Sequence, residues 1–261
     1  MNDSAIAAAS VYREWPAPRP WRPTVVCRWE QRVVGGDYVQ RVLPDGCADI
    51  IVDDAGRGLV VGPNRHATMP RLAPGVLSGI RFRTEAIGPV FGVAASELAG
   101  RAVPLDAVVA PRQAREVVEM LVTGREASGW WADVDTDPRL RAACSALAGT
   151  HDSVARVAET IGLSVRQLRR LLLDATGQGP KTLQRVGRLR RFLSLADQHR
   201  APWSLADLAA AAGYADQAHL TREVRDLAGT TPAGLLRERS RAAPVTAPLT
   251  RPSGDGGTNR G

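Results

Sequence analysis

Residues able to hydrogen-bond to the edges of DNA bases cluster at two places in the C-terminal third of the sequence. The first cluster is rich in arginine, and its members are Arg166, Gln167, Arg169 and Arg170. The second cluster mixes polar types, and its members are Gln217, His219, Thr221 and Arg222. Arginine can donate two parallel hydrogen bonds to guanine, and glutamine can pair in the same way with adenine. These residue types favour contact with duplex DNA, provided that each cluster lies on the exposed face of a helix.

The sequence around the two clusters repeats itself. Residues 153–158 recur as residues 204–209, and Gly162 recurs as Gly213, both with an offset of 51 residues. Beyond the glycine the matches continue with an offset of 52, so one residue is inserted in the turn of the second copy. A match that extends over about 30 residues indicates two copies of one structural unit.

The first copy has the pattern of a helix-turn-helix unit. Apolar residues from Val154 to Ile161 follow the spacing i, i+3, i+4 and i+7, which predicts a helix with one buried stripe. Gly162 is expected to end that helix in a tight turn, and Ser164 is a good N-cap for a second helix. The second helix is predicted to bury Val165, Leu168, Leu171 and Leu172. The arginine-rich cluster is then left on its outer face.

The second copy follows the same plan. Ser204 is expected to cap its first helix, Gly213 to begin the turn and Asp216 to cap its second helix. The second helix is predicted to bury Leu220, Val224 and Leu227. Between the copies, one helix is predicted from Pro180 to about His199. Such a helix could hold the two outer helices roughly 34 Å apart, which is one turn of DNA.

With these features the C-terminal region resembles the AraC/XylS family of transcription regulators. The resemblance covers residues 153–239, and its most diagnostic parts are the run GYADQAHL at 213–220 and the motif GTTP at 229–232. It implies that both clusters contact double-stranded DNA, with Thr221 assigned to phosphate, and that the protein activates or represses transcription. The family commonly has phenylalanine or another aromatic residue at four positions of this region: Leu172, Tyr214, Leu220 and Val224.

The N-terminal half has a different organisation. Short β-runs separated by turn residues occupy residues 24–84 and predict roughly five antiparallel strands, after which helical patterns take over. The sequence therefore predicts the α+β class, with a small antiparallel β domain followed by an all-α double helix-turn-helix domain. The predicted segments are an extended arm (1–23), a β-rich sensor and dimerisation domain with C-terminal helices (24–150), a DNA-binding domain (151–240) and a disordered tail (241–261).

A weaker resemblance concerns the N-terminal half. PDGCADIIV at 44–52, GP at 62–63 and GIRFRTEAIGPVFG at 79–92 resemble an uncharacterised sensor-like domain found in front of such DNA-binding domains. By analogy with the family, this half is expected to be a small cupin-like barrel, with the helices over 111–149 forming contacts in a homodimer. A small-molecule effector and RNA polymerase are further candidate partners.

Candidate ligand-binding residues in the N-terminal half are Arg81 and Arg83. They alternate with Ile80 and Phe82, as on a strand with one buried face. They could clamp an anionic ligand, and the alternative is that both are ordinary exposed arginines. Cys47 is either a redox or alkylation sensor or a plain small strand residue.

Metal binding is not predicted for the N-terminal half. Four aspartates lie near the middle of its strands, namely Asp45, Asp49, Asp53 and Asp54, but His66 is the only histidine there. No cofactor is expected. Three tryptophans either line a pocket or close a barrel, namely Trp15, Trp21 and Trp29.

Charge is distributed unevenly along the chain. Residues 1–150 contain 17 arginines and 17 acidic residues, whereas residues 151–241 contain 15 basic and 9 acidic residues. A basic region beside a neutral one indicates either a polyanionic partner or a solvated surface in an arginine-rich protein. No apolar run reaches membrane-spanning length and no signal sequence is recognised, so a cytoplasmic protein without a membrane partner is expected.

The leading hypothesis is thus a DNA-binding transcription regulator that is not an enzyme. One alternative is a cupin-like metal enzyme or an alkyl-transferring enzyme with a DNA-binding appendage, which requires a metal-ligand cluster or an activated cysteine. Another is a protein-interaction module, which requires apolar residues on the outer helix faces in place of arginine, glutamine and threonine.

Overall fold

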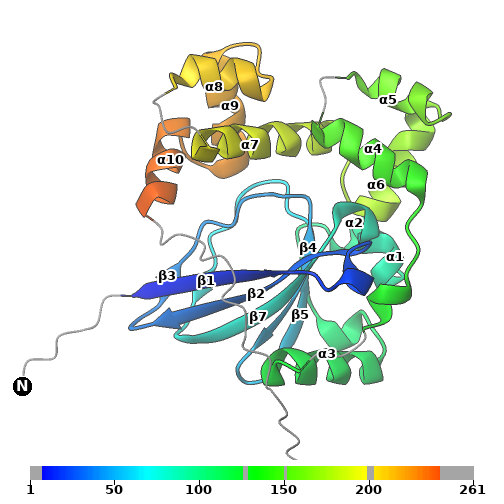
Figure 1. Ribbon diagram of the computed structural model, residues 1–261, viewed down its shortest axis with the longest axis vertical. Coiled ribbons are helices and arrows are strands. Elements are labelled where there is room, and N and C mark those ends of the chain that lie inside the picture. The colour runs from blue at the N-terminus through cyan, green and yellow to red at the C-terminus, as the bar shows by residue number, and fades with distance from the viewer. Residues whose placement is uncertain (1–7, 126–128, 150–151, 199–202, 242–261) are drawn as a thin grey trace, which may run out of the picture.

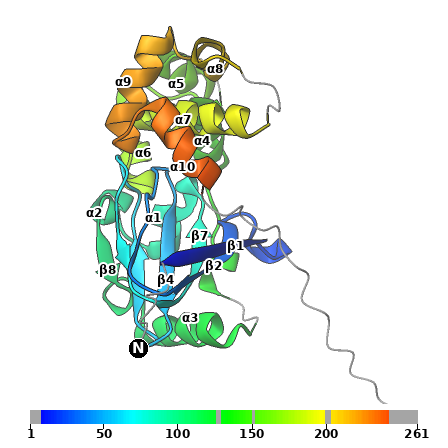
Figure 2. The same ribbon diagram turned by 90° about the vertical axis from the view of Figure 1, so that its left-hand side faces the viewer.

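The computed structural model describes residues 8–125, 129–149, 152–198 and 203–241. An antiparallel sheet with short helices makes up the N-terminal part, and the chain is helical from residue 138 onward. The helical part lies at one end of the sheet part in both views (Figures 1 and 2). The α+β class predicted from the sequence is confirmed.

The main sheet is antiparallel and open. Its strands are β1 (Ala9–Pro16), β2 (Val25–Val34), β4 (Ala48–Asp53), β5 (Gly58–Val61), β7 (Gly75–Phe82) and β8 (Ala102–Pro104). They lie in the order β1, β2, β7, β4, β5, β8. A separate two-stranded ribbon pairs β3 (Tyr38–Val39) with β6 (Arg71–Leu72). Because β1 and β8 are edges and do not pair with each other, the sheet fits the expected cupin-like barrel only loosely.

The two faces of the main sheet differ because side chains alternate along each strand. In β4, Ala48, Ile50 and Val52 are buried in the core, whereas Asp49 lies on the opposite face. Trp131 is only 1% exposed within the same core. The helices that contribute to this core include α1 (Ile87–Phe91), α2 (Ala95–Leu98), α3 (Pro111–Thr123) and the 3-10 helix η4 (Trp130–Asp133).

The N-terminal segment belongs to the sheet and is not a separate arm. Its residues are extended as expected, but β1 pairs with β2 along its whole length, from Ala9 opposite Val34 to Pro16 opposite Cys27. The 3-10 helix η1 (Arg19–Trp21) follows and places the Trp21 side chain in the core. A disordered tail was expected over residues 241–261, and residues 242–261 lie outside the described residues.

Seven helices are described in the C-terminal part. They are α4 (Pro138–Gly149), α5 (Val154–Thr160), α6 (Val165–Thr176), α7 (Pro180–Gln198), α8 (Leu205–Ala212), α9 (Gln217–Ala228) and α10 (Pro232–Arg241). The long helix α7 confirms the helix predicted from Pro180. Leu183 of α7 packs with α4, α5 and α6, whereas Leu189 and Phe192 pack with α8, α9 and α10. α7 therefore joins two small hydrophobic cores, one at each end (Figure 1).

Helix α4 packs with the helical part, although the sequence assigned it to the preceding domain. Its buried residues Leu140, Ala143 and Leu147 share one core with α5 and α6. Gly187 of α7 permits this contact, because a Cβ atom there would lie 2.4 Å from the carbonyl oxygen of Ala148. The boundary expected near residue 150 therefore does not separate two cores.

The N-terminal part contacts the C-terminal end of α6. A Cβ atom on Gly88 in α1 would lie 2.8 Å from the carbonyl oxygen of Asp174. A Cβ atom on Gly177, directly after α6, would lie 2.6 Å from the carbonyl oxygen of Ala95 in α2. Two glycines thus allow the backbones of the two parts to meet closely.

Candidate nucleic-acid interface

The first helix pair consists of α5, a short turn and α6. Gly162 in the turn has a φ of 71°, a conformation that side chains with a Cβ atom rarely adopt. Ser164 caps α6, because its Oγ accepts a hydrogen bond from the backbone N–H of Gln167 at 3.2 Å. Leu168 and Leu172 are fully buried on the inner face. The turn glycine, the cap and the two buried leucines are therefore placed as the sequence predicted.

The outer face of α6 carries the arginine-rich cluster. Arg166, Arg169 and Arg170 are exposed, and the described residues provide none of them with a hydrogen bond or an ion pair. Gln167 is also exposed, but its Oε1 accepts hydrogen bonds from the backbone N–H of Ser164 at 2.9 Å and from its hydroxyl at 2.8 Å. With its amide oxygen occupied, Gln167 cannot pair bidentately with adenine in this conformation.

The burial predicted for Val165 is wrong. Its side chain is 47% exposed, whereas Leu171 is partly buried and packs at the edge of the core. Val165 is the first residue of α6, and the side chain of a helical residue points back toward the N-terminus of its helix. It therefore projects over the turn and away from the core.

The second helix pair consists of α8, a turn and α9. Ser204 caps α8 by accepting a hydrogen bond from the backbone N–H of Asp207 at 3.1 Å, and Gly213 has a φ of 89°. Asp216 caps α9 by accepting a hydrogen bond from the backbone N–H of His219 at 2.6 Å. The three inward-facing residues predicted for α9 are all buried, namely Leu220, Val224 and Leu227.

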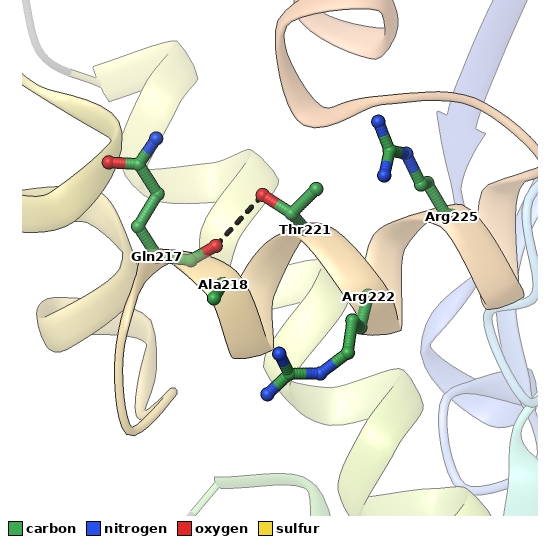
Figure 3. Close-up of a pocket in the computed structure, with 5 residues that line it drawn as sticks. All are labelled: Gln217, Ala218, Thr221, Arg222 and Arg225. Carbon is green, nitrogen blue, oxygen red and sulfur yellow. Dashed lines mark hydrogen bonds between the residues drawn. The ribbon is translucent and has the colours of Figure 1, made fainter.

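The outer face of α9 is shallowly hollowed (Figure 3). The hollow measures about 540 Å³, and its lining residues are Gln217, Ala218, Thr221, Arg222 and Arg225. The hydroxyl of Thr221 donates to the backbone carbonyl of Gln217 at 2.8 Å. Sequence reasoning missed Ala218 and Arg225. Arg225 follows Thr221 by one helical turn, so helical spacing could have identified it.

His219 is placed differently from its predicted neighbours. Its Nδ1 accepts a hydrogen bond from the backbone N–H of Ala215 at 3.2 Å, and its Nε2 lies 3.8 Å from a carboxylate oxygen of Glu223. Its ring meets the ring of Tyr214 edge-on, with centroids 5.3 Å apart. In this conformation His219 supports the turn of its own unit and does not point freely outward.

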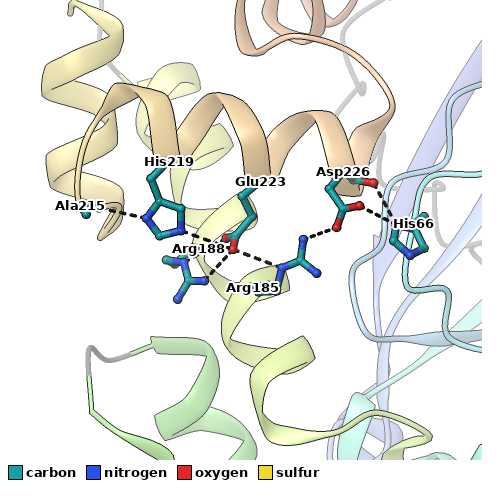
Figure 4. Close-up of polar contacts among 7 residues, drawn as sticks. All are labelled: His66, Arg185, Arg188, Ala215, His219, Glu223 and Asp226. Atoms are coloured by element: carbon teal, nitrogen blue, oxygen red, sulfur yellow. Dashed lines mark hydrogen bonds and ion pairs between the residues drawn. The ribbon is translucent and has the colours of Figure 1, made fainter.

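An ionic cluster with a buried glutamate at its centre attaches α9 to α7 (Figure 4). Glu223 is 7% exposed and accepts hydrogen bonds from Arg188 at 3.0 and 2.8 Å and from Arg185 at 3.2 Å. Arg185 also binds Asp226 and thereby lowers the pKa of that carboxyl. The sequence did not reveal this cluster, because its members lie on separate helices and no short motif joins them.

The two helix pairs lie at opposite ends of α7 (Figure 1). The helix has 19 residues and is therefore about 28 Å long. This connection places two outer helices, each with exposed arginines, on one rigid element.

Arg81 does not present a free positive charge to an anion. It lies 3.3 Å from a carboxylate oxygen of Glu14, 3.5 Å from one of Asp45 and 3.2 Å from one of Asp49. The indole of Trp29 also donates to Asp49 at 2.7 Å. Burial raises the pKa of Asp49 to about 6, although the charge of Arg81 opposes this rise. The cluster is therefore rich in negative charge.

The remaining candidates of the N-terminal part also have structural surroundings. Arg83 follows β7 and donates from its Nε to the carbonyl of Arg22 at 2.8 Å, so it does not converge with Arg81 on a common ligand site. Burial raises the pKa of Cys27 to about 12 and raises that of Cys47 well above its ordinary value. Neither thiol has the lowered pKa that activates a nucleophilic or redox-sensing cysteine.

The tryptophans have separate roles in this part. Trp21 packs edge-on against Trp131 in the core, with ring centroids 5.2 Å apart. The indole ring of Trp29 lies over Gly79 of the neighbouring strand β7, where a Cβ atom would lie 2.4 Å from the ring. Trp15 is half-buried on the edge strand. Trp21 and Trp29 are therefore packed side chains, but because the sheet is open they do not close a barrel.

The described residues contain neither a metal-binding cluster nor a membrane-spanning helix. In residues 8–241, without the short gaps noted above, no three histidine, cysteine, aspartate or glutamate side chains are placed to hold a metal ion. Within the same ranges, no helix combines the length and the apolar character needed to cross a membrane.

Two family models match the chain. Residues 157–238 match a model described as a helix-turn-helix domain, and these residues contain both helix pairs except for the start of α5. Residues 13–104 match a domain of unknown function, DUF6597, and these residues contain the main sheet except for the first half of β1. No curated protein sequence matched the chain.

Solved structures show a distant similarity. A probable AraC family transcriptional regulator from Rhodopseudomonas palustris CGA009 is 18% identical, with 39% of this chain and 97% of that chain covered and a TM-score of 0.35. ToxT from Vibrio cholerae O395 is 9% identical, with 88% of this chain and 97% of that chain covered and a TM-score of 0.42. ToxT from Vibrio cholerae strain SCE256, bound to an unsaturated fatty acid, is 10% identical, with 90% and 96% covered and a TM-score of 0.38.

Proposed function

We propose that the chain is a DNA-binding transcription regulator of the AraC type, and that both helix pairs of its helix-turn-helix domain contact one DNA duplex at the same time. In this proposal α6 and α9 are the two recognition helices. Each enters the major groove, and the chain reads two successive segments of a sequence-specific site. The observation that carries the proposal is the presence of two exposed, arginine-bearing second helices at the two ends of α7.

The contacts follow from the exposure of the side chains. We assign base recognition in the first segment to Arg166, Arg169 and Arg170, because their guanidinium groups are not engaged by other described residues. Gln167 can join them only after it leaves its capping interaction with Ser164. In the second segment the base-recognising groups are Gln217, Arg222 and Arg225, which line the hollow on α9 together with Thr221, the residue assigned to phosphate. His219 contributes indirectly, through the turn.

The N-terminal part is the proposed receiver of a signal. It contacts the C-terminal end of α6 through α1 and α2, so a change in its shape can reach a recognition helix directly. A small-molecule effector is the proposed source of such a change. RNA polymerase and a second copy of the chain are the further partners that a regulator of this kind would engage.

The test is the selection of binding sites from a random pool of DNA duplexes. We expect the wild-type chain to enrich two half-sites whose centres lie roughly 34 Å apart. The double variant Arg166→Ala, Arg170→Ala should lose the first half-site and keep the second. The variant Arg222→Ala should lose information in the second half-site only. The mass of the complex on the enriched duplex gives the number of bound copies.

Arg115→Ala is the matched control, because it also removes an exposed arginine but lies on α3, away from both helix pairs. It should enrich the same motif as the wild-type chain. A wild-type motif that both recognition-helix variants retain in full would contradict the proposal.

A further inference from the structure

The C-terminal end of the second recognition helix, α9, is bound by the N-terminal part of the chain. The backbone N–H of Ala67 donates to the carbonyl of Leu227 at 2.6 Å, and Nη1 of Arg41 donates to the carbonyl of Ala228 at 2.6 Å. Nδ1 of His66 lies 2.9 Å from the carbonyl oxygen of Asp226. The last carbonyls of a helix have no partner within the helix. Three successive carbonyls of α9 therefore find partners about 160 residues or more away in the sequence.

These three groups belong to one structural unit, which we call the ribbon segment. It consists of residues 38–43 and 65–72, which lie before β4 and after β5 in the sequence. It contains β3 and β6, and its two sides are further joined by the mutual backbone hydrogen bonds of Val42 and Thr68 at 2.9 and 3.0 Å. Leu43 of this segment packs against the hydrophobic core formed by α7, α8, α9 and α10. The segment therefore contacts α9 through both polar and apolar groups.

Arg41 makes the most extensive of these contacts. Besides Ala228, it binds both carboxylate oxygens of Glu238 in α10, at 2.8 Å from Nε and 3.3 Å from Nη2. Its side chain is 19% exposed. A planar guanidinium that bonds two partners at once fixes their relative position, which a more flexible amine could not do. Arg41 thus joins α9 and α10 to the ribbon segment.

Helix α7 also contacts α9, and the contacts from α7 and from the ribbon segment meet at Asp226. Asp226 contacts Arg185 of α7, and its carboxylate also lies 3.9 Å from His66 of the ribbon segment (Figure 4). Glu223, one turn earlier, binds Arg185 and Arg188. The helix is thereby held from α7 and from the N-terminal part, while the face that carries Arg222 stays exposed.

We propose that the ribbon segment is an intramolecular clamp that fixes the second recognition helix, so that the N-terminal part sets the position from which α9 reaches DNA. The role in DNA binding rests on the proposed function above, whereas the clamp itself is a property of the free protein. A displacement of the ribbon segment releases three carbonyls of α9 and the ion pair of Arg41 with Glu238 together. The second half-site is then the part of the DNA site that is sensitive to the state of the N-terminal part.

The experiment compares amide hydrogen exchange of the full-length wild-type chain, without DNA, with that of Arg41→Ala. We expect at least roughly tenfold faster exchange of the Ala67 amide and of the amides at the end of α9, since one charge-assisted hydrogen bond and one ion pair are lost. Arg65→Ala is the control. Arg65 is exposed in the same segment, and the described part of the chain gives it no hydrogen bond or ion pair. The amides of Arg65→Ala should exchange at the same rates as those of the wild-type chain.

DNA binding supplies the second measurement. Against a duplex with both half-sites, Arg41→Ala should bind about tenfold more weakly than the wild type, in line with the loss of one charge-assisted contact. Against a duplex with the first half-site alone, the two proteins should bind equally. Arg65→Ala should match the wild type on both duplexes, which excludes a general effect of removing one positive charge.

The outcomes separate the clamp from the proposed function. Wild-type exchange rates in Arg41→Ala overturn the clamp, whatever the protein does with DNA. Faster exchange with unchanged binding to the two-site duplex overturns its role in DNA recognition. A wild-type chain that binds no duplex contradicts the proposed function, and the exchange rates still decide the clamp. If Arg41→Ala does not fold, Arg41→Lys takes its place under the same criteria, because lysine cannot bond Ala228 and Glu238 in the same fork.

Discussion

Two neighbouring polar residues on α6 differ in whether their side chains already have hydrogen-bond partners within the protein. This difference decides which of them can bind DNA without losing another contact. Arg166 extends into solvent, whereas Gln167 bonds back to Ser164 and completes the N-terminal cap of its helix. A capping box satisfies backbone donors that would otherwise lack partners. Gln167 therefore stabilises the recognition helix itself, and its use in base recognition would require the loss of that interaction.

A first prediction concerns Asp49, whose pKa is raised to about 6 by burial. A carboxyl with a raised pKa in the folded state favours folding at low pH, and this contribution is lost as the pH rises from about 4 to 6. Replacement by asparagine removes this dependence and keeps an acceptor for Trp29. Between pH 4.5 and 7, we expect the stability of Asp49→Asn to gain about 2 kcal/mol relative to the wild type. Urea unfolding at the two pH values measures it, and parallel pH profiles for both proteins would contradict it.

A second prediction concerns Glu223, which is almost fully buried between Arg185 and Arg188. Glu223→Gln removes the charge that holds two arginines, and we expect a loss of about 2 kcal/mol in the free energy of unfolding. Glu159→Gln is the control, since Glu159 pairs with Arg156 at an exposed site and should change stability by less than about 0.5 kcal/mol. Equal effects of the two substitutions would show that burial of the cluster is unimportant.

Contacts between elements hold each recognition helix at its C-terminal end. For α6, the support comes from α1 and α2, where Gly88 and Gly177 allow the backbones to approach. For α9, it comes from the ribbon segment and α7. The outer face of the N-terminal half of each recognition helix stays exposed, and this half commonly contacts base edges in helix-turn-helix proteins.

A third prediction tests the contact of α1 with α6. Alanine normally stabilises a helix relative to glycine. At Gly88, however, the added Cβ atom would lie 2.8 Å from the carbonyl oxygen of Asp174. We therefore expect Gly88→Ala to lower the free energy of unfolding by about 1–3 kcal/mol. Gly179→Ala, where no atom lies within 4 Å of the added Cβ, should not show this loss. Chemical unfolding measures the free energy of unfolding of both variants, and an equal value for the two would contradict the prediction.

The distribution of charge over the whole molecule matches the proposed use of its two parts. Five exposed arginines lie on the two recognition helices, namely Arg166, Arg169, Arg170, Arg222 and Arg225. In the N-terminal part, by contrast, Arg81 is surrounded by three carboxylates. Residues 1–150 as a whole carry 17 arginines and 17 acidic residues, so we expect the electrostatic contribution to DNA binding to come mainly from the helical part.

A fourth prediction follows for salt dependence. Each neutralised phosphate contributes about −0.9 to the slope of log K against log salt concentration. Each of the five exposed arginines brings one positive charge close to the phosphates even when its guanidinium contacts a base, so we expect a slope between about −3 and −5 on a two-site duplex. A duplex with only one half-site should give a shallower slope. Equal slopes for the two duplexes, measured by fluorescence titration, would mean that only one helix pair contacts DNA.

The sequence by itself determined the local structure of the C-terminal part. Helical spacing, the capping residues Ser164, Ser204 and Asp216, and the glycines in the two turns specify the helix pairs, and the structure has each of them where expected. These features act over a few residues, so they can be recognised in a one-dimensional pattern. The position of Val165 was mistaken because a helix end does not follow the burial pattern of its interior.

The contacts between distant segments were decided only by the tertiary structure. The edge strand β1, the packing of α4 with α5 and α6, the carboxylates around Arg81 and the hold of Arg41 on α9 all join residues far apart in the sequence. Such contacts depend on which surfaces meet when the whole chain packs, and no spacing rule encodes them. Local hydrogen bonding thus explains how the recognition helices form, whereas long-range packing explains how they are held.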